Sequence, residues 1–348
     1  MNSPWKKQGG WRLNLIGSDF PLGITILLGI VILALGVFFG LLYLGIDRKL
    51  VARMQGRIGP PIRQPFRDVS KLLMKESIIP GDAISWLFKF APVLCLMGAA
   101  VLLLYVPLFG QPALLEGSGD IIVVLYLLII PALALVVAGF SSSSPFATVG
   151  AQREMVTLMS YEFPLVMSVV AIAWHTGHVA GASPFLFSTL AAFPIWGQLG
   201  PVGIAGAVLL LLVLLFIIPG ELSKIPFDMA EAETELAGGV LVEYSGRNFA
   251  LFYVANAVKA IALVAIVVGL FFPYNLSPII GIGAAIPATI IDGVFFLIKV
   301  FLVMFVSVMV ARAAMARFKI DQASKIYFIS STLVGLLGLI LLWVDLVI

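Results

Sequence analysis

Eight long runs of apolar residues constrain this chain more than any other feature. Hydrophobic residues make up 61% of its 348 residues, and the mean hydropathy is +1.12. A helix needs about 20 residues to cross the roughly 30 Å core of a bilayer, and each run is near that length. The sequence therefore predicts an all-α integral membrane protein, a bundle of about eight transmembrane helices. The runs lie near 20–46, 88–109, 121–140, 161–180, 202–219, 249–272, 289–311 and 327–347.

The connections between these runs are short, so we expect one polytopic membrane domain over residues 1–348. The first run could be mistaken for a signal peptide. It is too long for one, lacks an A-x-A-like end, and continues into the charged residues 47–49. We therefore expect a retained span.

Few residues could bind a metal or a redox centre. Cys95 is the only cysteine, and one thiol cannot build a disulfide, a zinc site or an iron–sulfur cluster. His175 and His178 could share a helix face near a metal. We favour polar residues at a membrane interface instead, because no acid or cysteine stands near them in sequence. No redox cofactor or metal is expected on this chain.

The basic residues are distributed unevenly among the connections. Sixteen of the 21 lie in the four odd-numbered connections, three lie in the N-terminal tail, and the connections after spans 2, 4 and 6 carry none. Cytoplasmic loops of membrane proteins are enriched in Lys and Arg. We therefore expect the odd-numbered connections in the cytoplasm and both termini outside. This places a basic loop (47–87) and an acidic loop (220–248) on the cytoplasmic side.

The acidic loop holds more carboxylates than its length and position would suggest. Its sequence over 226–246 is PFDMAEAETELAGGVLVEYSG. We expect Asp228 to begin a helix as an N-cap, with Glu231 completing an acidic capping box. At 100° per residue, Asp228, Glu231 and Glu235 would share a stripe, and Glu233 would point the other way.

Three carboxylates on one stripe repel one another, so partly buried ones would bind protons near neutral pH. Gly238-Gly239 should end the helix, and Glu243 returns towards the sixth span. A solvated acidic face is the alternative interpretation.

Five charged residues lie inside or beside the apolar runs. Lys259 has about ten apolar residues on either side, so snorkelling to the interface explains it poorly. Asp292 and Lys299 are seven apart and share a helix face. Glu154 and Glu162 stand at the entry to the fourth span. We favour a polar pathway through spans 4, 6 and 7 over snorkelling of each residue separately.

The basic loop contains a predicted amphipathic helix at the interface. Four apolar residues, Phe66, Val69, Leu72 and Leu73, would lie on one face, with charged residues largely on the other. Binding to anionic lipid is the simpler interpretation. Because Arg makes rigid, bidentate contacts, we also expect a partner to dock here. The candidate docking residues are Arg48, Lys49, Arg53, Arg57, Arg63, Arg67, Asp68, Lys71 and Lys75.

Five stretches in colinear order resemble the membrane-embedded H subunit of respiratory complex I (NADH-quinone oxidoreductase). They are DRKLVARMQGRIGP (47–60), QPFRDVSKLLMKE (64–76), AQREMVTLMSYE (151–162), KIPFDMAEAETELAGGVLVEYSG (224–246) and RFKIDQ (317–322).

One departure concerns the branch of the family. Between Gly59-Pro60 and Gln64-Pro65 the chain has only PIR, where the respiratory subunit carries a longer insertion near its quinone entrance. The short form is more similar to the equivalent subunit of group 4 membrane-bound nickel–iron hydrogenases, formate hydrogenlyases and sulfur-reducing complexes. The resemblance therefore implies a hydrogenase-type complex in a prokaryotic cell membrane. The alternative is the equivalent subunit of an NADH- or ferredoxin-quinone oxidoreductase, with part of a quinone site.

The resemblance also implies a role. Hydrophilic partner subunits would carry the iron–sulfur clusters and, in the hydrogenase branch, a nickel–iron centre. This chain would anchor them, contact antiporter-like and small membrane subunits and lipid, bind no nucleic acid, and couple electron transfer to H+ or Na+ movement. The resemblance assigns six acids to an acidic proton channel: Glu162, Asp228, Glu231, Glu233, Glu235 and Glu243. The charges inside and beside the apolar runs add Glu154, Lys259, Asp292 and Lys299 to the expected pathway.

Two other function classes remain open at this point. A stand-alone secondary transporter would usually show repeated halves, and these halves do not match. A passive anchor would need the basic loop but would have no use for Lys259 or Glu235.

Overall fold

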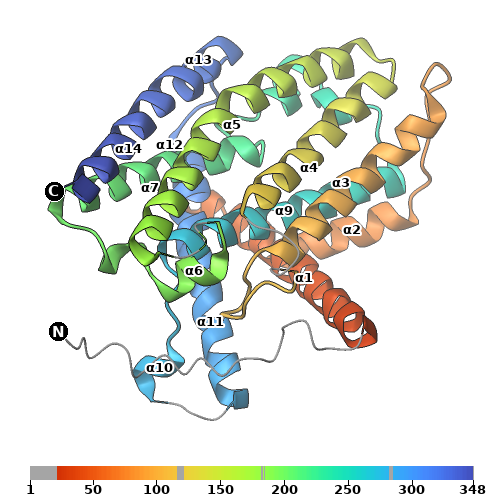
Figure 1. Ribbon diagram of the computed structural model, residues 1–348. Helices are drawn as coiled ribbons and strands as arrows, with labels where there is room; N and C mark the ends of the chain where they lie inside the picture. Colours follow the sequence, from red (N-terminus) through yellow and green to blue (C-terminus); the bar gives the residue numbers. More distant parts are fainter. Residues whose placement is uncertain (1–21, 116–120, 182, 184, 282–284, 348) are drawn as a thin grey trace, which may run out of the picture.

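The computed structural model describes residues 22–115, 121–181, 183, 185–281 and 285–347 (Figure 1). The three basic residues of the N-terminal tail and the first residues of the predicted first span lie outside these ranges. Within these ranges all regular secondary structure is helical, apart from one isolated bridge between Leu108 and Gln111. Among the described residues eight helices are long and apolar enough to cross a membrane, as the eight apolar runs predicted.

Six spans are single helices and two contain a π-helical turn. The single helices are α1 (Leu22–Met54), α3 (Ser85–Tyr105), α4 (Ile121–Ser141), α5 (Pro145–Ala180), α7 (Pro201–Glu221) and α9 (Gly246–Phe271). The seventh span joins α11 (Ala285–Met304) through the π turn Phe305–Met309 to α12 (Val310–Ala314). The eighth joins α13 (Ile320–Lys325) through the π turn Ile326–Ser331 to α14 (Thr332–Val347).

Short helices occupy the connections. They are α2 (Gln64–Met74), α6 (Phe187–Ala192), α8 (Glu233–Leu236), α10 (Ser277–Ile280) and the 3-10 turns Ile195–Gly197, Met229–Glu231 and Gly239–Leu241.

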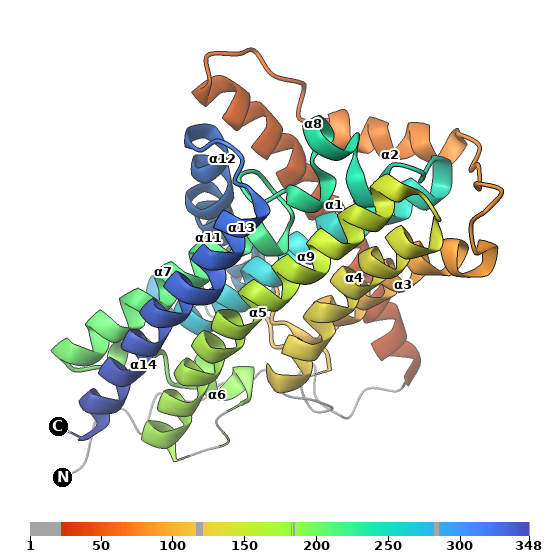
Figure 2. The same cartoon turned by 90° about the horizontal axis from the view of Figure 1, so that it is seen from above.

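Helix α9 forms the centre of the bundle. It packs against α1, α3, α4, α7 and α11, and its side chains from Ala257 to Phe271 are all buried. Helices α3, α4, α5, α7 and α14 run side by side, and α1 and α11 cross them obliquely (Figures 1 and 2). From Ala257 to Phe271 the helix is apolar all round except for Lys259, which is typical of a buried span.

The connections gather at two ends of the bundle. We call the end with connections 55–84, 142–144, 222–245 and 315–319 the basic end. Its loops are bonded to one another, since the Ile78 amide donates to Ser245 Oγ and the Phe318 amide donates to the Pro226 carbonyl.

Connections 106–115, 185–200 and 272–281 lie at what we call the opposite end. There the Ile121 amide bonds the Phe185 carbonyl, and Trp196 Nε1 bonds the Phe271 carbonyl. This grouping agrees with the predicted alternation of the spans.

Prolines inside the spans explain two contacts between helices. Pro219 has no N–H, so the Leu215 carbonyl in α7 lacks its usual donor four residues on. Ser307 Oγ, in the π turn of the seventh span, donates to this carbonyl at 2.6 Å. Pro92 likewise frees the Phe88 carbonyl, which accepts from the Tyr244 hydroxyl at 3.2 Å. A carbonyl left free inside lipid must find such a partner.

The fourth span differs most from the prediction. The helix begins at Pro145, not near residue 161, and runs to Ala180. Gln152, Arg153 and Glu154 lower the local hydropathy, so the apolar run begins later than the helix does. Consequently Glu154 and Glu162 lie along α5 and not at its entry.

Candidate functional site

A buried ion pair joins two of the spans. Lys259 Nζ lies 2.6 Å from the Glu221 carboxylate and also donates to the Glu221 backbone carbonyl at 2.8 Å. Only 6% of the lysine side chain and 2% of the glutamate side chain are exposed. Glu221 is the last residue of α7, where a helix dipole favours a cation. Lys259, the charge that snorkelling explained least well, thus has a specific partner.

This pair lies deep in the bundle because the acidic loop enters it. Lys259 is the fourteenth residue of α9, about 20 Å along the helix from Gly246 at 1.5 Å per residue. Helix α7 ends at that level, so residues 222–245 fill the space between it and the start of α9. Phe227 and Met229 of this loop are buried in the main core.

Helix α5 lines the other side of the pair. Glu154 is 4% exposed and interacts electrostatically with Lys259, Glu231 and Glu221. Tyr327 lies in the π turn of the eighth span, and its ring packs edge-on against Tyr161 of α5. Its hydroxyl donates to the Phe216 carbonyl of α7. The Tyr161 hydroxyl lies close to Glu221 but makes no well-directed hydrogen bond to any described residue. Titratable groups from several spans therefore meet at one place.

The predicted helix through the acidic stretch is wrong. A 3-10 turn ends at Glu231, Ala232 adopts an extended ψ of 99°, and α8 is a separate turn. Asp228 precedes the 3-10 turn but makes no capping bond with its side chain. Asp228, Glu231 and Glu235 therefore do not share one helical stripe. The predicted end at Gly238-Gly239 is confirmed, since α8 stops at Leu236 and both glycines have positive φ.

Arginines from neighbouring segments bind two of the carboxylates that the prediction placed on this stripe. Arg317 holds Asp228 with two bonds, Nε to Oδ1 at 2.7 Å and Nη2 to Oδ2 at 2.5 Å, and reaches Thr234 at 2.8 Å. Arg153 of α5 holds Glu235 at 2.5 Å. A bidentate arginine–carboxylate pair fixes geometry as well as charge. The acidic loop is thus held between α5 and the last connection.

The protonation of the loop is governed by Glu231 and Lys224. Burial raises the pKa of Glu231, and Asp228 and Glu233 add to this while Lys224 opposes it. Burial also lowers the pKa of Lys224, which Glu231 and Asp47 partly offset. Each shift favours the uncharged form of its group.

The pKa of Glu235 behaves in the opposite way. The hydrogen bond from Arg153 holds this pKa below the ordinary glutamate value. Glu235 is therefore a fixed anion, unlike the proton-binding residue that a shared stripe would have made it.

Asp292 and Lys299 bind backbone groups at the opposite end. The Asp292 carboxylate accepts the amides of Leu276 and Ser277 at 2.9 and 2.8 Å, at the start of α10. Lys299 Nζ donates to the carbonyls of Phe272 and Tyr274, just beyond α9. These contacts account for both charges as caps of helix ends.

Three of the predicted acids form no hydrogen bond or ion pair through their side chains within the described part of the chain. Glu162 is half-buried on α5, Glu233 is exposed on α8, and Glu243 is half-buried before α9. Because Glu233 is exposed, it lies at the surface of the basic end.

The basic loop divides into fixed and exposed cations. Arg48 pairs with Asp68 at 3.1 Å and lies over the Tyr253 ring, so both residues hold α2 in place. Lys49 is half-buried. The remaining candidates are exposed: Arg53, Arg57, Arg63, Arg67, Lys71 and Lys75.

The amphipathic helix is confirmed, with a narrower apolar face than expected. Phe66 and Val69 of α2 pack on Leu41 and Leu44 of α1 and on Ala257 of α9, while Leu73 is 48% exposed.

Sequence reasoning missed several residues of this network. Glu221 and Lys224 belong to the acidic loop in the sequence, but neither was among the predicted pathway residues. Asp47 is buried at the end of α1 and pairs with Arg312 of α12. An acid that ends an apolar run, as Glu221 does, was the available signal. No pattern indicated that Tyr161 would lie beside it.

Among the described residues no group of three or more His, Cys, Asp and Glu side chains could hold a metal ion. The site is instead an alternation of carboxylates, lysines and arginines. Such a network can store and pass protons, because neighbouring charges couple the protonation of each group to the next.

Comparison with known proteins identifies relatives over most of the chain. The NADH dehydrogenase family matches residues 26–343. Hydrogenase-4 component C of Escherichia coli (strain K12) is 33% identical over 278 residues, 79% of this chain and 83% of that protein. The H subunit of NADH-quinone oxidoreductase from Dehalococcoides mccartyi (strain CBDB1) is 28% identical over 312 residues, 86% of this chain and 79% of that protein.

A solved structure has the same fold. A chain of the membrane-bound sulfane sulfur reductase, described as an archaeal respiratory membrane complex, aligns with a TM-score of 0.79 and 27% sequence identity. The alignment covers 91% of this chain and 99% of that chain.

Proposed function

This chain belongs to the NADH dehydrogenase family, as the resemblance to a complex I membrane subunit implied, and we propose from that premise that it is the coupling subunit of an ion-translocating respiratory complex. Hydrophilic partner subunits carry the redox centres, and this chain anchors them to the membrane. It converts their electron transfer into movement of H+ or Na+, together with antiporter-like membrane subunits.

The hydrogenase or sulfur-reductase branch is the proposed setting. Two observations support it: the 33% identity to hydrogenase-4 component C and the likeness to the sulfane sulfur reductase chain over nearly its whole length. The connection from α1 to α2 is also short, and the Ile62 carbonyl lies directly against Gly45 of α1. A quinone oxidoreductase is the other candidate, supported by the relatives from NADH-quinone oxidoreductases.

The buried Glu221–Lys259 pair carries the proposal. An anchor gains nothing from two charges inside a membrane span, because their desolvation costs several kcal/mol per ion. When such a pair breaks, the partner no longer offsets each charge. The unpaired charges would then change the protonation of Glu154 and Glu231. The pair is thus suited to a step in which a conformational change moves protons.

The acidic loop is the proposed link to the redox arm. It lies at the basic end, where the positive-inside rule places the cytoplasm, and it reaches from the surface at Glu233 to the buried pair. Movement of a docked soluble subunit would shift this loop. Protons would then pass by way of Glu231 and Glu154 to Glu221. Asp292 and Lys299 take no part in this version of the pathway, since they cap backbone groups.

The test uses the whole complex purified with its soluble subunits and reconstituted in vesicles. Lys259→Met should retain subunit stoichiometry and uncoupled electron transfer but lose most ion pumping. Glu76→Gln, an exposed acid beyond the pathway, is the matched control. Wild-type pumping in Lys259→Met would reject the proposed role, as would loss of pumping in the control to the same extent.

A further inference from the structure

A buried histidine near the opposite end has no assigned role. His175 of α5 is 1% exposed, and neither of its ring nitrogens has a hydrogen-bond partner in the described part of the chain. An unpartnered polar group in a protein interior costs free energy, so such groups are few and call for an explanation. The hydroxyl of the adjacent Thr176, also buried, is unpartnered within the same described ranges.

A carboxylate from another span acts on this histidine through space. Asp345 of α14 interacts electrostatically with His175, and its oxygens accept the amides of Gly200 and Gly203 at 3.0 and 2.9 Å. These amides begin α7, where the helix dipole stabilises an anion. His178, exposed and stacked on Trp174, is the other titratable group that acts on His175 among the described residues.

The spacing between the two histidines did not predict this difference. They are three residues apart on one helix, yet one is buried and the other faces out. His178 is exposed, as a polar residue at an interface would be, whereas His175 is buried inside the bundle.

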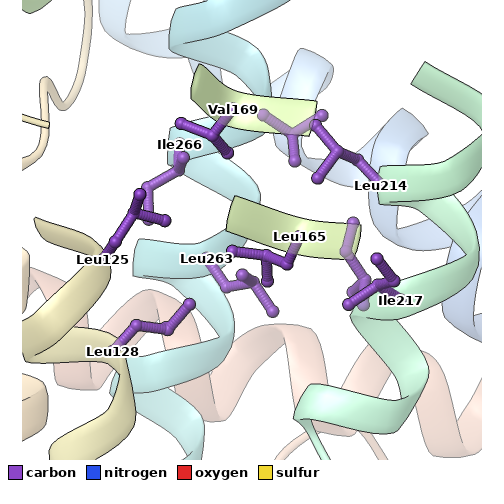
Figure 3. Close-up of a pocket in the computed structure, with 10 residues that line it drawn as sticks. Leu125, Leu128, Leu165, Val169, Leu214, Ile217, Leu263 and Ile266 are labelled. Atoms are coloured by element: carbon purple, nitrogen blue, oxygen red, sulfur yellow. The ribbon is translucent and has the colours of Figure 1, made fainter. Parts of the chain in front are cut away.

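Helix α5 connects this histidine to the Glu221–Lys259 pair through an apolar gap. Tyr161 lies beside Glu221, and His175 lies about 21 Å further along the helix. Between them Leu165 and Val169 face a small cavity closed by α4, α7 and α9 (Figure 3).

The cavity lining is entirely apolar, because α4, α7 and α9 complete it with leucine, isoleucine and valine side chains. Its volume is about 10 Å³, which is near the lower limit for holding one water molecule. It therefore keeps the two polar sites apart in this conformation.

We propose that His175 and Asp345 form a second proton-binding site, on the side of the apolar cavity opposite to the Glu221–Lys259 pair. A ring nitrogen of His175 accepts one proton, and the Asp345 carboxylate stabilises the imidazolium electrostatically. The same proton later leaves to solvent at the opposite end, so charge and atoms balance without a redox partner. This inference rests on the proposed coupling role and gives it an exit.

Direct titration tests the site. The chain has only two histidines, so ¹⁵N-histidine labelling with His178→Gln leaves one imidazole signal from the full chain in lipid bilayers. In spectra recorded from about pH 4 to 9 the His175 nitrogens should titrate, and Asp345→Asn should shift that transition to lower pH. A signal that does not change across this range would overturn the proposal.

Pumping by the reconstituted complex separates this inference from the proposed function. His175→Gln, with His175→Asn as a second variant, should lower ions moved per electron at least tenfold and leave assembly and uncoupled electron transfer unchanged. His178→Gln should behave as wild type. Normal pumping in both His175 variants, with pumping lost in Lys259→Met, overturns this site alone. Normal pumping in Lys259→Met as well rejects the coupling role itself.

Discussion

Single residues show where sequence reasoning succeeds and where it stops. A lysine inside an apolar run needs a partner, so the position of Lys259 in the sequence was enough to single it out. Its partner did not, because Glu221 looked like one of many acids in a loop. Only the level at which α7 ends relative to α9 brings the two together, and that level depends on packing.

The pair makes a prediction about stability. Lys259→Met leaves Glu221 buried without its cation, so the free energy of unfolding should fall by roughly 3 kcal/mol. Adding Glu221→Gln to this variant should restore much of the loss, because neither charge then remains. Thermal midpoints of the chain in detergent measure both effects.

The exposed pair of Arg153 with Glu235 is the control for this experiment. Glu235→Gln should change the midpoint little, since exposed ion pairs contribute little to stability. If the double variant is no more stable than Lys259→Met, the cost lies in packing and not in an unpaired charge.

Glu231 predicts a pH dependence of stability. Its pKa is raised by burial, so the folded chain binds this proton more tightly than the unfolded chain. The contribution is fully present below the ordinary glutamate pKa and is lost as pH rises through the raised value. Wild type should therefore lose stability over this window, and Glu231→Gln should lose less. Unfolding midpoints measured from about pH 4 to 8 test the difference.

Glu76→Gln provides the comparison for that titration, because Glu76 is exposed and is not among the charges that act on Glu231. Identical pH profiles for wild type and Glu231→Gln would show that another group is responsible.

At the scale of elements, the apolar runs located the spans. Polar residues near the ends of these runs hid where the helices begin and end. The sequence could not place the start of α5, because Arg153 and Glu154 interrupt its hydropathy without breaking the helix. It also predicted one helix over residues 228–235, where the structure has two separate turns. The arginines that hold this stretch, Arg153 and Arg317, come from other segments, so no local pattern could reveal them.

Helix α7 predicts a compensation between two residues. Ser307→Ala removes the side-chain donor to the Leu215 carbonyl, which should lower the free energy of unfolding by about 1–3 kcal/mol. Pro219→Ala supplies a backbone N–H to that carbonyl. The double variant should therefore be more stable than Ser307→Ala alone, as chemical unfolding in mixed micelles would measure.

Ser331→Ala is the matched control, since its hydroxyl bonds a carbonyl of its own π turn. If Pro219→Ala changes the stability of wild type and of Ser307→Ala by the same amount, the Ser307 hydroxyl is not replacing the missing amide.

For the whole molecule, charge asymmetry gave the arrangement of the connections correctly. The loops predicted to share one side are bonded to one another at the basic end. Two features could not be foreseen. The oblique crossing of α1 and α11 and the depth of the acidic loop both depend on how helices pack, which hydropathy does not encode (Figure 1).

Under the proposed function, the same asymmetry predicts where the soluble arm binds. Arg57 and Arg63 are exposed at the basic end, whereas Arg48 is already paired with Asp68. Reversing both charges with Arg57→Glu and Arg63→Glu should weaken docking of the soluble subunits by about 1.4 kcal/mol, about tenfold. Rebinding of stripped soluble subunits to inside-out vesicles, measured at low and high salt, tests this.

Lys89→Ala, an exposed cation on α3, is the control, and it should bind normally. Because salt screens exposed charges, the difference between wild type and the double reversal should shrink as ionic strength rises. Equal affinities at low salt would mean that the soluble arm binds elsewhere. Binding only to right-side-out vesicles would instead invert the proposed topology, because the basic end would then face outside.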